Sequence, residues 1–265
     1  MTSLSKKPIF PSNDKMAKSH GTAGRNAHEM AQQRYKKVAI YAALLFLIAI
    51  LIFSNLNNFA KLGLPAAIFL AVVIKLIADG IEKKGLHVKK RAKDADRGAH
   101  AEEVVAEGLM NLPDGYHAFH DISFDGFNID HVVVGSGGIF LVETKSHSGK
   151  VDAKGDTLLL NDKQPLKNFL NQTWSQTYQL REFLKKQTSR EWNVKPILCF
   201  TRAFVSVRAP VKGISVVNKK YLTTYLLQQQ KILNPEDIET ITKILQSWIS
   251  KQDKPAKISV SCSSR

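Results

Sequence analysis

Cysteine and acidic residues are scarce in this sequence of 265 residues. The two cysteines, Cys199 and Cys262, lie far apart and form no CxxC pair, so neither a zinc ribbon nor a disulfide framework is expected. Only 23 Asp and Glu stand against 38 Lys and Arg, which gives a formal net charge of +15. This excess predicts a polyanionic partner, either nucleic acid or anionic lipid, and says nothing about the fold.

Charge is almost missing from two apolar stretches near the start of the chain. Residues 38–53, "VAIYAALLFLIAILIF", contain no charged residue and are apolar on every helical face, which predicts a membrane span rather than a core helix. Residues 62–78 form the second stretch and contain Lys75, whose long side chain can reach an interface. We therefore expect a transmembrane helical hairpin over residues 38–79, with a re-entrant or interfacial second segment as the alternative.

A cleavable signal peptide is not expected, because the polar arm before the first apolar stretch is long and no small-x-small pattern follows it. The linker between the two stretches contains one basic residue, Lys61, whereas both outer flanks contain several. Positive flanks mark the cytoplasmic side. The sequence predicts a multi-pass protein of the cytoplasmic (inner) membrane, with both termini and the soluble domain in the cytoplasm.

The remaining segments differ clearly in composition. Residues 1–37 are polar and predict a disordered cytoplasmic arm, residues 80–97 a basic juxtamembrane linker that meets anionic lipid, and residues 253–265 a flexible tail. Residues 98–252 show a helix, three strands, a helix, a strand and further helices, with no internal repeat. This order predicts a soluble α/β domain. Asn234 followed by Pro235 predicts the start of the last helix.

Carboxylates and a lysine interrupt an otherwise apolar strand hairpin, "NIDHVVVGSGGIFLVETKS". A turn over Gly135–Gly138 places Asp130 opposite Glu143, and Lys145 shares a face with Glu143. Opposed carboxylates repel, so we expect a divalent cation, Mg²⁺ or Mn²⁺, between them. With an ammonium group beside it, such a site suits metal-assisted phosphodiester hydrolysis, which agrees with the basic charge. The alternative is a surface hairpin end with solvated acids and a Lys–Glu pair.

The domain resembles the NERD (nuclease-related) domain, a relative of the PD-(D/E)XK nuclease superfamily. The resemblance covers residues 98–188. The sequence differs from two of the family's motifs: Ala101 occupies a glycine position and Phe169 a proline position. Neither difference removes a charged residue of the motifs. The resemblance lies in four stretches: "GAHAEEVVAEGL", "NIDHVVVGSGGIFLVETKS", "HSGKV" and "NFLNQTWSQTYQLREFL".

The resemblance implies a restriction-endonuclease-like core, which is a mixed central sheet flanked by helices, and a defined set of site residues. Asp130, Glu143 and Glu102 would be the metal ligands, Lys145 the catalytic lysine, and Gln172 a residue that contacts the substrate or orients the site. We expect a membrane-anchored, Mg²⁺-dependent nuclease that cuts nucleic acid, with DNA as the expected substrate. Two alternatives remain at this point: a catalytically inactive nucleic-acid-binding or scaffold module of the same fold, and a domain that serves protein contacts only.

Several aromatic residues are assigned no part in this site. His131 is expected to be a packing or surface residue on the strand face opposite Asp130, and His117 and His120 show no partner in the sequence. Trp174 and Tyr178 lie one helical turn apart. This spacing favours two core residues, with a surface that stacks on nucleic-acid bases as the second interpretation.

Overall fold

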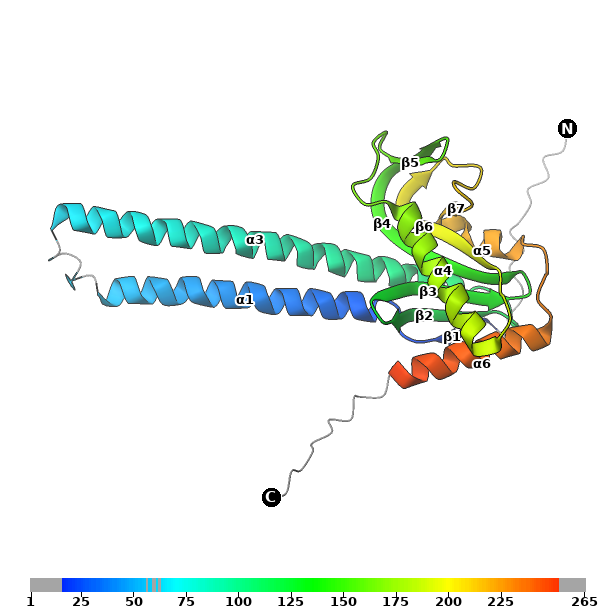
Figure 1. Ribbon diagram of the computed structural model, residues 1–265. Helices are drawn as coiled ribbons and strands as arrows, with labels where there is room; N and C mark the ends of the chain where they lie inside the picture. Colours follow the sequence, from blue (N-terminus) through cyan, green and yellow to red (C-terminus); the bar gives the residue numbers. More distant parts are fainter. Residues whose placement is uncertain (1–15, 56, 59–60, 62, 253–265) are drawn as a thin grey trace, which may run out of the picture. The chain divides into compact units, whose positions relative to one another are not determined.

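The computed structural model describes residues 16–55, 57–58, 61 and 63–252 (Figure 1). The chain divides into two units, one of residues 25–100 and one formed by the residues up to Gly24 together with those from Ala101 onward. The predicted tail and the first 15 residues of the predicted arm lie outside the described residues.

The unit of residues 25–100 is a hairpin of two long helices, α1 (Arg25–Ser54) and α3 (Leu64–Leu109), of which the last turns of α3 belong to the other unit. The Arg34 guanidinium donates to the Arg91 carbonyl over 2.7 Å, and His28 lies 3.6 Å from Asp96, so the two helices run antiparallel. In the described part of the chain, α1 is the one helix that is long and apolar enough to cross a membrane.

This hairpin differs from the sequence prediction in two ways. From Leu64 onward the predicted second span and the predicted basic linker, residues 80–97, form one continuous helix, because the one proline of this stretch, Pro65, lies in the first turn, where proline is tolerated, and the rest is rich in helix-favouring Lys, Ala and Leu. The second span is therefore not confirmed. The predicted disordered arm is wrong for residues 18–37, because α1 begins at Arg25 and residues 18–20 form a strand.

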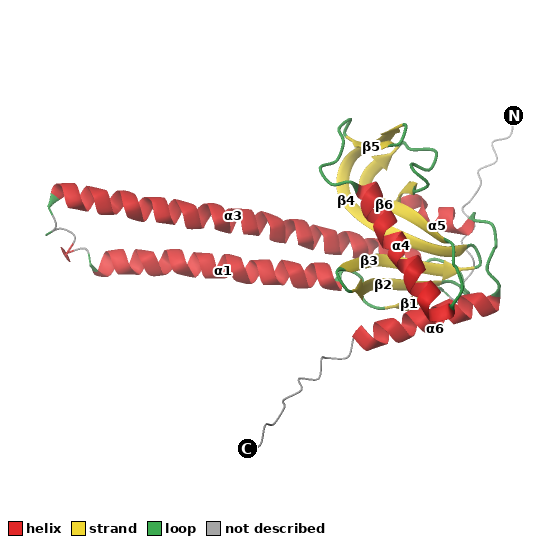
Figure 2. Cartoon of the chain, in the orientation of Figure 1, coloured by secondary structure: helices red, strands yellow, loops and turns green. Residues whose placement is uncertain are grey.

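The other unit contains a seven-stranded mixed sheet (Figure 2), as the sequence predicted. Its path is β1-β2-β3-β4-β6-β7, and β5 pairs with β4 beside that path. Neighbouring strands pair antiparallel from β2 to β5 in chain order, whereas β1–β2, β4–β6 and β6–β7 are parallel. The strands are β1 (Lys18–His20), β2 (His117–Phe124), β3 (Phe127–Gly135), β4 (Gly138–Lys154), β5 (Thr157–Leu160), β6 (Val194–Val205) and β7 (Ser215–Asn218).

Helices cover both faces of this sheet, because the central strands are apolar on both sides. One core cluster joins β3 and β4 to α4 (Phe169–Thr188) and α6 (Pro235–Gln252), and includes Leu180, Ile241 and Leu245. Another joins the opposite face to the end of α3 and to α5 (Lys219–Leu227). A third lies between the start of α4 and β6.

The hairpin register that the sequence predicted is confirmed at the turn. Gly135 pairs with Gly138, and the ladder continues as far as His131 opposite Val142. Gly138 has φ +128°, a conformation that glycine adopts without steric strain, so the turn places β3 and β4 in this register. The last helix also begins as predicted, since the Asn234 side chain accepts a hydrogen bond from the Asp237 amide at 2.8 Å.

Candidate active site

Three of the predicted site residues meet where β4 passes under α4. The Lys145 ammonium donates to a carboxylate oxygen of Glu143 and, over 3.1 Å, to the Gln172 side-chain carbonyl. The Gln172 amide in turn donates to the same Glu143 oxygen over 2.7 Å. Only 3% of the Glu143 side chain and 12% of the Lys145 side chain are exposed, whereas Gln172 is exposed. The triangle is therefore mostly buried and opens toward solvent at Gln172.

Phe169, which replaces the proline of the family motif, lies against this triangle. Its ring centroid is 5.0 Å from the Lys145 nitrogen, within the range of a cation–π contact. The preceding residue, Asn168, begins α4 by accepting a hydrogen bond from the Asn171 amide at 3.0 Å. The departure from the motif thus supplies an aromatic face that holds the ammonium group, and the cap fixes the helix that carries Gln172.

Asp130 joins the site from β3. Its carboxylate accepts the Thr144 amide hydrogen over 2.7 Å, just beyond the last ladder pair of β3 and β4. Burial raises the pKa of Asp130 well above its ordinary value, and repulsion from Glu143 and Glu102 raises it further. Asp130 therefore lies close enough to both other acids for the three carboxylates to influence one another, as the sequence predicted for Asp130 and Glu143.

Glu102 lies in the part of α3 that belongs to the sheet unit. Burial raises the pKa of Glu102 to about 8, with further repulsion first from Asp121 and then from Glu143, while a hydrogen bond from the Gly24 amide opposes the shift. The structure therefore brings all five predicted site residues to one end of the sheet.

Asp121 is an acidic residue of this region that the sequence reasoning missed. It is 1% exposed, has φ +54°, and accepts a hydrogen bond from the Asn128 amide over 2.6 Å. The β2–β3 register places it across from Asp130. One signal was available in the sequence: "HAFHDISF" is otherwise an apolar strand with two histidines, and a carboxylate buried in such a strand needs polar partners.

The opposite strand face holds a buried histidine pair. The Nδ1 atoms of His120 and His131 are 2.8 Å apart, and the Nε2 atom of each is buried with no partner in the described structure. Burial lowers the pKa of His120 to about 4 and that of His131 well below its ordinary value. The packing role expected for His131 is confirmed. The expectation that His117 and His120 have no partner is wrong, because His117 also lies 3.4 Å from a ring nitrogen of His20.

The acidic residues suit a hard cation in their chemistry. Mg²⁺ prefers oxygen ligands and is commonly held by one or two carboxylates with water completing its shell. In the part of the chain that the structure describes, Glu143 Oε2 is buried without a hydrogen-bond partner, so its lone pairs are open to a cation. Among the described residues, no group of three or more His, Cys, Asp and Glu side chains is placed to hold a metal ion. The assignment of Asp130, Glu143 and Glu102 as ligands stays a prediction.

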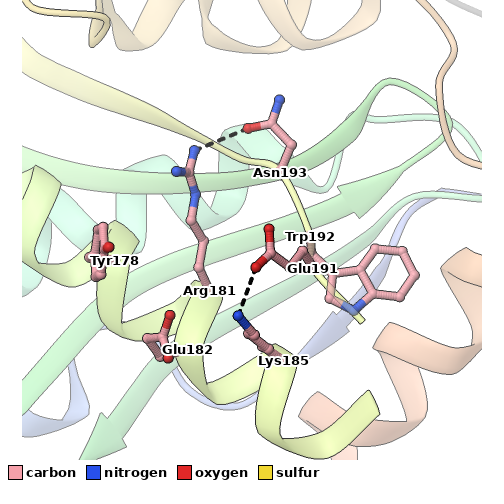
Figure 3. Close-up of a pocket in the computed structure, with 7 residues that line it drawn as sticks. All are labelled: Tyr178, Arg181, Glu182, Lys185, Glu191, Trp192 and Asn193. Atoms are coloured by element: carbon pink, nitrogen blue, oxygen red, sulfur yellow. Dashed lines mark hydrogen bonds and ion pairs between the residues drawn. The ribbon is translucent and has the colours of Figure 1, made fainter. Parts of the chain in front are cut away.

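A surface pocket of about 400 Å³ on the outer side of α4 does not belong to this site (Figure 3). Arg181 and Lys185 line it together with Glu182 and Glu191, so its charges balance. The Arg181 guanidinium donates to Asn193 over 3.0 Å and Lys185 to Glu191 over 2.7 Å, and the figure shows both contacts. Its cations are already paired, and the pocket has no excess positive charge to hold phosphate.

Comparison with known proteins supports the nuclease-like character of the domain. Residues 97–201 match the model of the nuclease-related domain family, NERD. The match extends beyond the predicted motif core to β6 and contains Glu102, Asp130, Glu143, Lys145 and Gln172. No curated protein and no solved structure was found to match the chain.

Proposed function

We propose that the chain is a membrane-anchored, metal-dependent nuclease, whose sheet domain hydrolyses phosphodiester bonds of nucleic acid at the cytoplasmic face. The observation that carries this proposal is the buried triangle of Glu143, Lys145 and Gln172, next to the Asp130 carboxylate, within a stretch that matches the nuclease-related family. The net charge of +15 supports a polyanionic substrate.

Each side chain has a chemical task in this proposal. Asp130 and Glu143 would hold Mg²⁺ or Mn²⁺, and a bound ion of this kind supplies charge neutralisation and a polarised water. Lys145 places a positive charge where negative charge develops on the phosphate, and Gln172 and Phe169 orient that ammonium group. The Thr144 amide holds Asp130 in place beside β4.

The apolar surface of α1 supports the membrane anchor. Its most apolar stretch buries no residue within the structure, and the large side chains Phe46, Leu47 and Phe53 are 55% to 81% exposed. A soluble helix of this composition would pack against a core. Basic residues flank the apolar stretch on the side of Arg34 and in α3, which favours the cytoplasmic placement of the sheet domain.

A second candidate function is a nucleic-acid-binding module without catalysis. One observation favours it: the Lys145 ammonium group already forms an ion pair with Glu143, so the charges of these two side chains balance each other without a metal ion. In this case the chain would bind nucleic acid equally well in a chelator and cut no substrate with any divalent ion.

The deciding experiment is a cleavage assay on the full chain in detergent, with single- and double-stranded DNA and RNA and with Mg²⁺, Mn²⁺ or a chelator. We expect metal-dependent cutting that falls by about 10²- to 10⁴-fold in Lys145→Ala and in Glu143→Ala. Lys243→Ala, an exposed lysine on α6, is the matched control and retains wild-type activity. Urea unfolding of each variant shows that the loss is not one of folding. Cutting that persists in both site variants would remove this site assignment.

A further inference from the structure

His147 lies beside the triangle of Glu143, Lys145 and Gln172. Its ring centroid is 5.1 Å from that of Phe169, and the Lys145 nitrogen is 5.0 Å from the centroid of the same ring. Both side chains therefore lie on the face of β4 that meets α4, as strand alternation gives for residues two apart. His147 is exposed, whereas the triangle is mostly buried, so His147 can contact a ligand that reaches the triangle from solvent.

The backbone at His147 departs from the regular ladder. The register between β4 and β6 shifts between Lys145 and Ser148, which places His147 in an irregular stretch of the strand. Such irregularities are common next to active sites, where they change the direction of a side chain. Phe169 is buried, and its ring centroid lies 6.3 Å from that of Phe200 in the same core cluster. The exposed imidazole therefore rests on a ring that the core holds in place.

Phe169 is also the first residue of α4, so Lys145 and His147 meet this helix at its positive end. The first amides of a helix have no acceptor within it, and the Asn168 side chain takes only that of Asn171. The first turn of α4 contains no acidic residue. The helix end, the ammonium group and the imidazole together form surroundings that favour an anion.

Glu143, Lys145 and His147 follow one another along β4 at intervals of two residues. Each interval measures about 6.6 to 6.8 Å along a strand. In the proposed function Glu143 holds the metal ion and Lys145 contacts the phosphate that is cut. His147 lies one interval farther from the metal ion, and is therefore placed for another phosphate of the same nucleic-acid strand.

We infer that His147 binds the phosphate next to the one that is cut, at the start of α4. The position next to the cut phosphate rests on the proposed function, whereas the binding of a phosphate does not. A neutral imidazole donates one N–H and a protonated imidazole two, so either form can hydrogen-bond to a phosphate oxygen. Because this contact needs a second phosphate, it favours a nucleic-acid chain over a ligand with a single phosphodiester.

The first test measures binding in a chelator, where metal-dependent cutting is absent. Fluorescence anisotropy follows the full chain in detergent with a labelled DNA oligonucleotide. We expect His147→Ala and His147→Phe to raise the Kd at least about three-fold, since each removes a hydrogen bond to a charged group. His147→Phe keeps a ring against Phe169 and so separates the phosphate contact from packing. His147→Lys restores a donor and keeps the Kd within about two-fold of wild type. His87→Ala removes an exposed histidine of α3 and leaves the Kd unchanged.

The second test compares cleavage of two substrates with Mg²⁺ or Mn²⁺. One is the same oligonucleotide, and the other is thymidine 5′-(p-nitrophenyl phosphate), which has one phosphodiester and no adjacent phosphate. We expect His147→Ala to lower kcat/KM for the oligonucleotide at least about three-fold and that for the small ester less than about two-fold, because only the oligonucleotide has the second phosphate. Lys145→Ala lowers both.

Three results decide between the readings. A wild-type Kd in His147→Phe would show that the ring only packs, and would overturn the inference. An equal loss of kcat/KM for both substrates in His147→Ala would place His147 on the phosphate that is cut, and would also overturn it. If the wild type cuts neither substrate while His147→Ala and His147→Phe still weaken binding, the proposed nuclease fails and the phosphate contact stands. Urea unfolding of each variant shows that no loss is one of folding.

Discussion

The hairpin of residues 25–100 and the sheet domain use the same kinds of apolar side chain in opposite ways. Phe119, Phe140 and Phe200 of the sheet are fully buried, whereas Phe46 and Phe53 of α1 are 69% and 81% exposed. The sheet domain therefore supplies its own apolar surroundings, and the hairpin does not. Because burial of apolar surface drives folding in water, the uncovered side chains of α1 are the part of the chain that the proposed membrane anchor would bury.

A charge placed in each region should have the largest effect on the difference between the two. Leu47→Arg puts a charged residue in the middle of the apolar stretch of α1 and should disfavour membrane insertion by about 3 to 4 kcal/mol. The measurement is the share of the chain retained in carbonate-washed membranes. Leu166→Arg, at a fully exposed loop position of the sheet domain, is the matched control and stays with the membrane. Equal retention of the two variants would contradict the assignment of α1 as the anchor.

Cavity-forming substitutions should affect the two regions unequally. Leu180 is fully buried in the core beneath α4, so Leu180→Ala should lower the free energy of unfolding by about 3 kcal/mol. Leu47→Ala should leave the unfolding of the sheet domain within about 0.5 kcal/mol of wild type. All three tryptophans, Trp174, Trp192 and Trp248, lie in the sheet domain, so their fluorescence in urea reports this domain alone. A similar shift from Leu47→Ala would show that the two regions unfold as one.

Acid should destabilise the sheet domain through its buried histidine pair. The pKa of His120 is about 4 in the folded state, below the ordinary 6.5, so the unfolded state binds more protons between these values. His120 therefore does not lower the free energy of unfolding above pH 6.5. As the pH falls from 6.5 toward 4 it lowers this free energy, by about 2 kcal/mol at pH 5.

The measurement for the histidine pair is the urea midpoint at pH 7 and at pH 5. His120→Gln should lose less stability on acidification than wild type, while His87→Gln, at an exposed position of the hairpin, should behave as wild type. An equal loss in His120→Gln and wild type would show that another group controls the acid response.

Local signals in the sequence predicted most of the sheet domain and its site. The Gly135–Gly138 turn was enough to set the β3–β4 register, because a hairpin register follows from its turn. The Asn234 cap marked the start of α6. The site residues were found through a motif, and the structure brought Glu102, Asp130, Glu143, Lys145 and Gln172 together.

Tertiary contacts decided what local signals left open. Residues 18–20 are polar and looked disordered, yet they pair with β2 as an edge strand, because a sheet edge offers hydrogen-bond partners that the segment cannot supply itself. Asp121 entered the acidic region only through the β2–β3 register, and His120 found its partner in the same way.

The sequence by itself determined the apolar helix, the α/β class of the domain and the residues of the acid–lysine motif, since periodicity, turn chemistry and charge act over a few residues. Only the tertiary structure decided which side chains from distant segments touch. Those contacts depend on strand order, register and helix placement, which are properties of the whole packed domain and not of any short stretch.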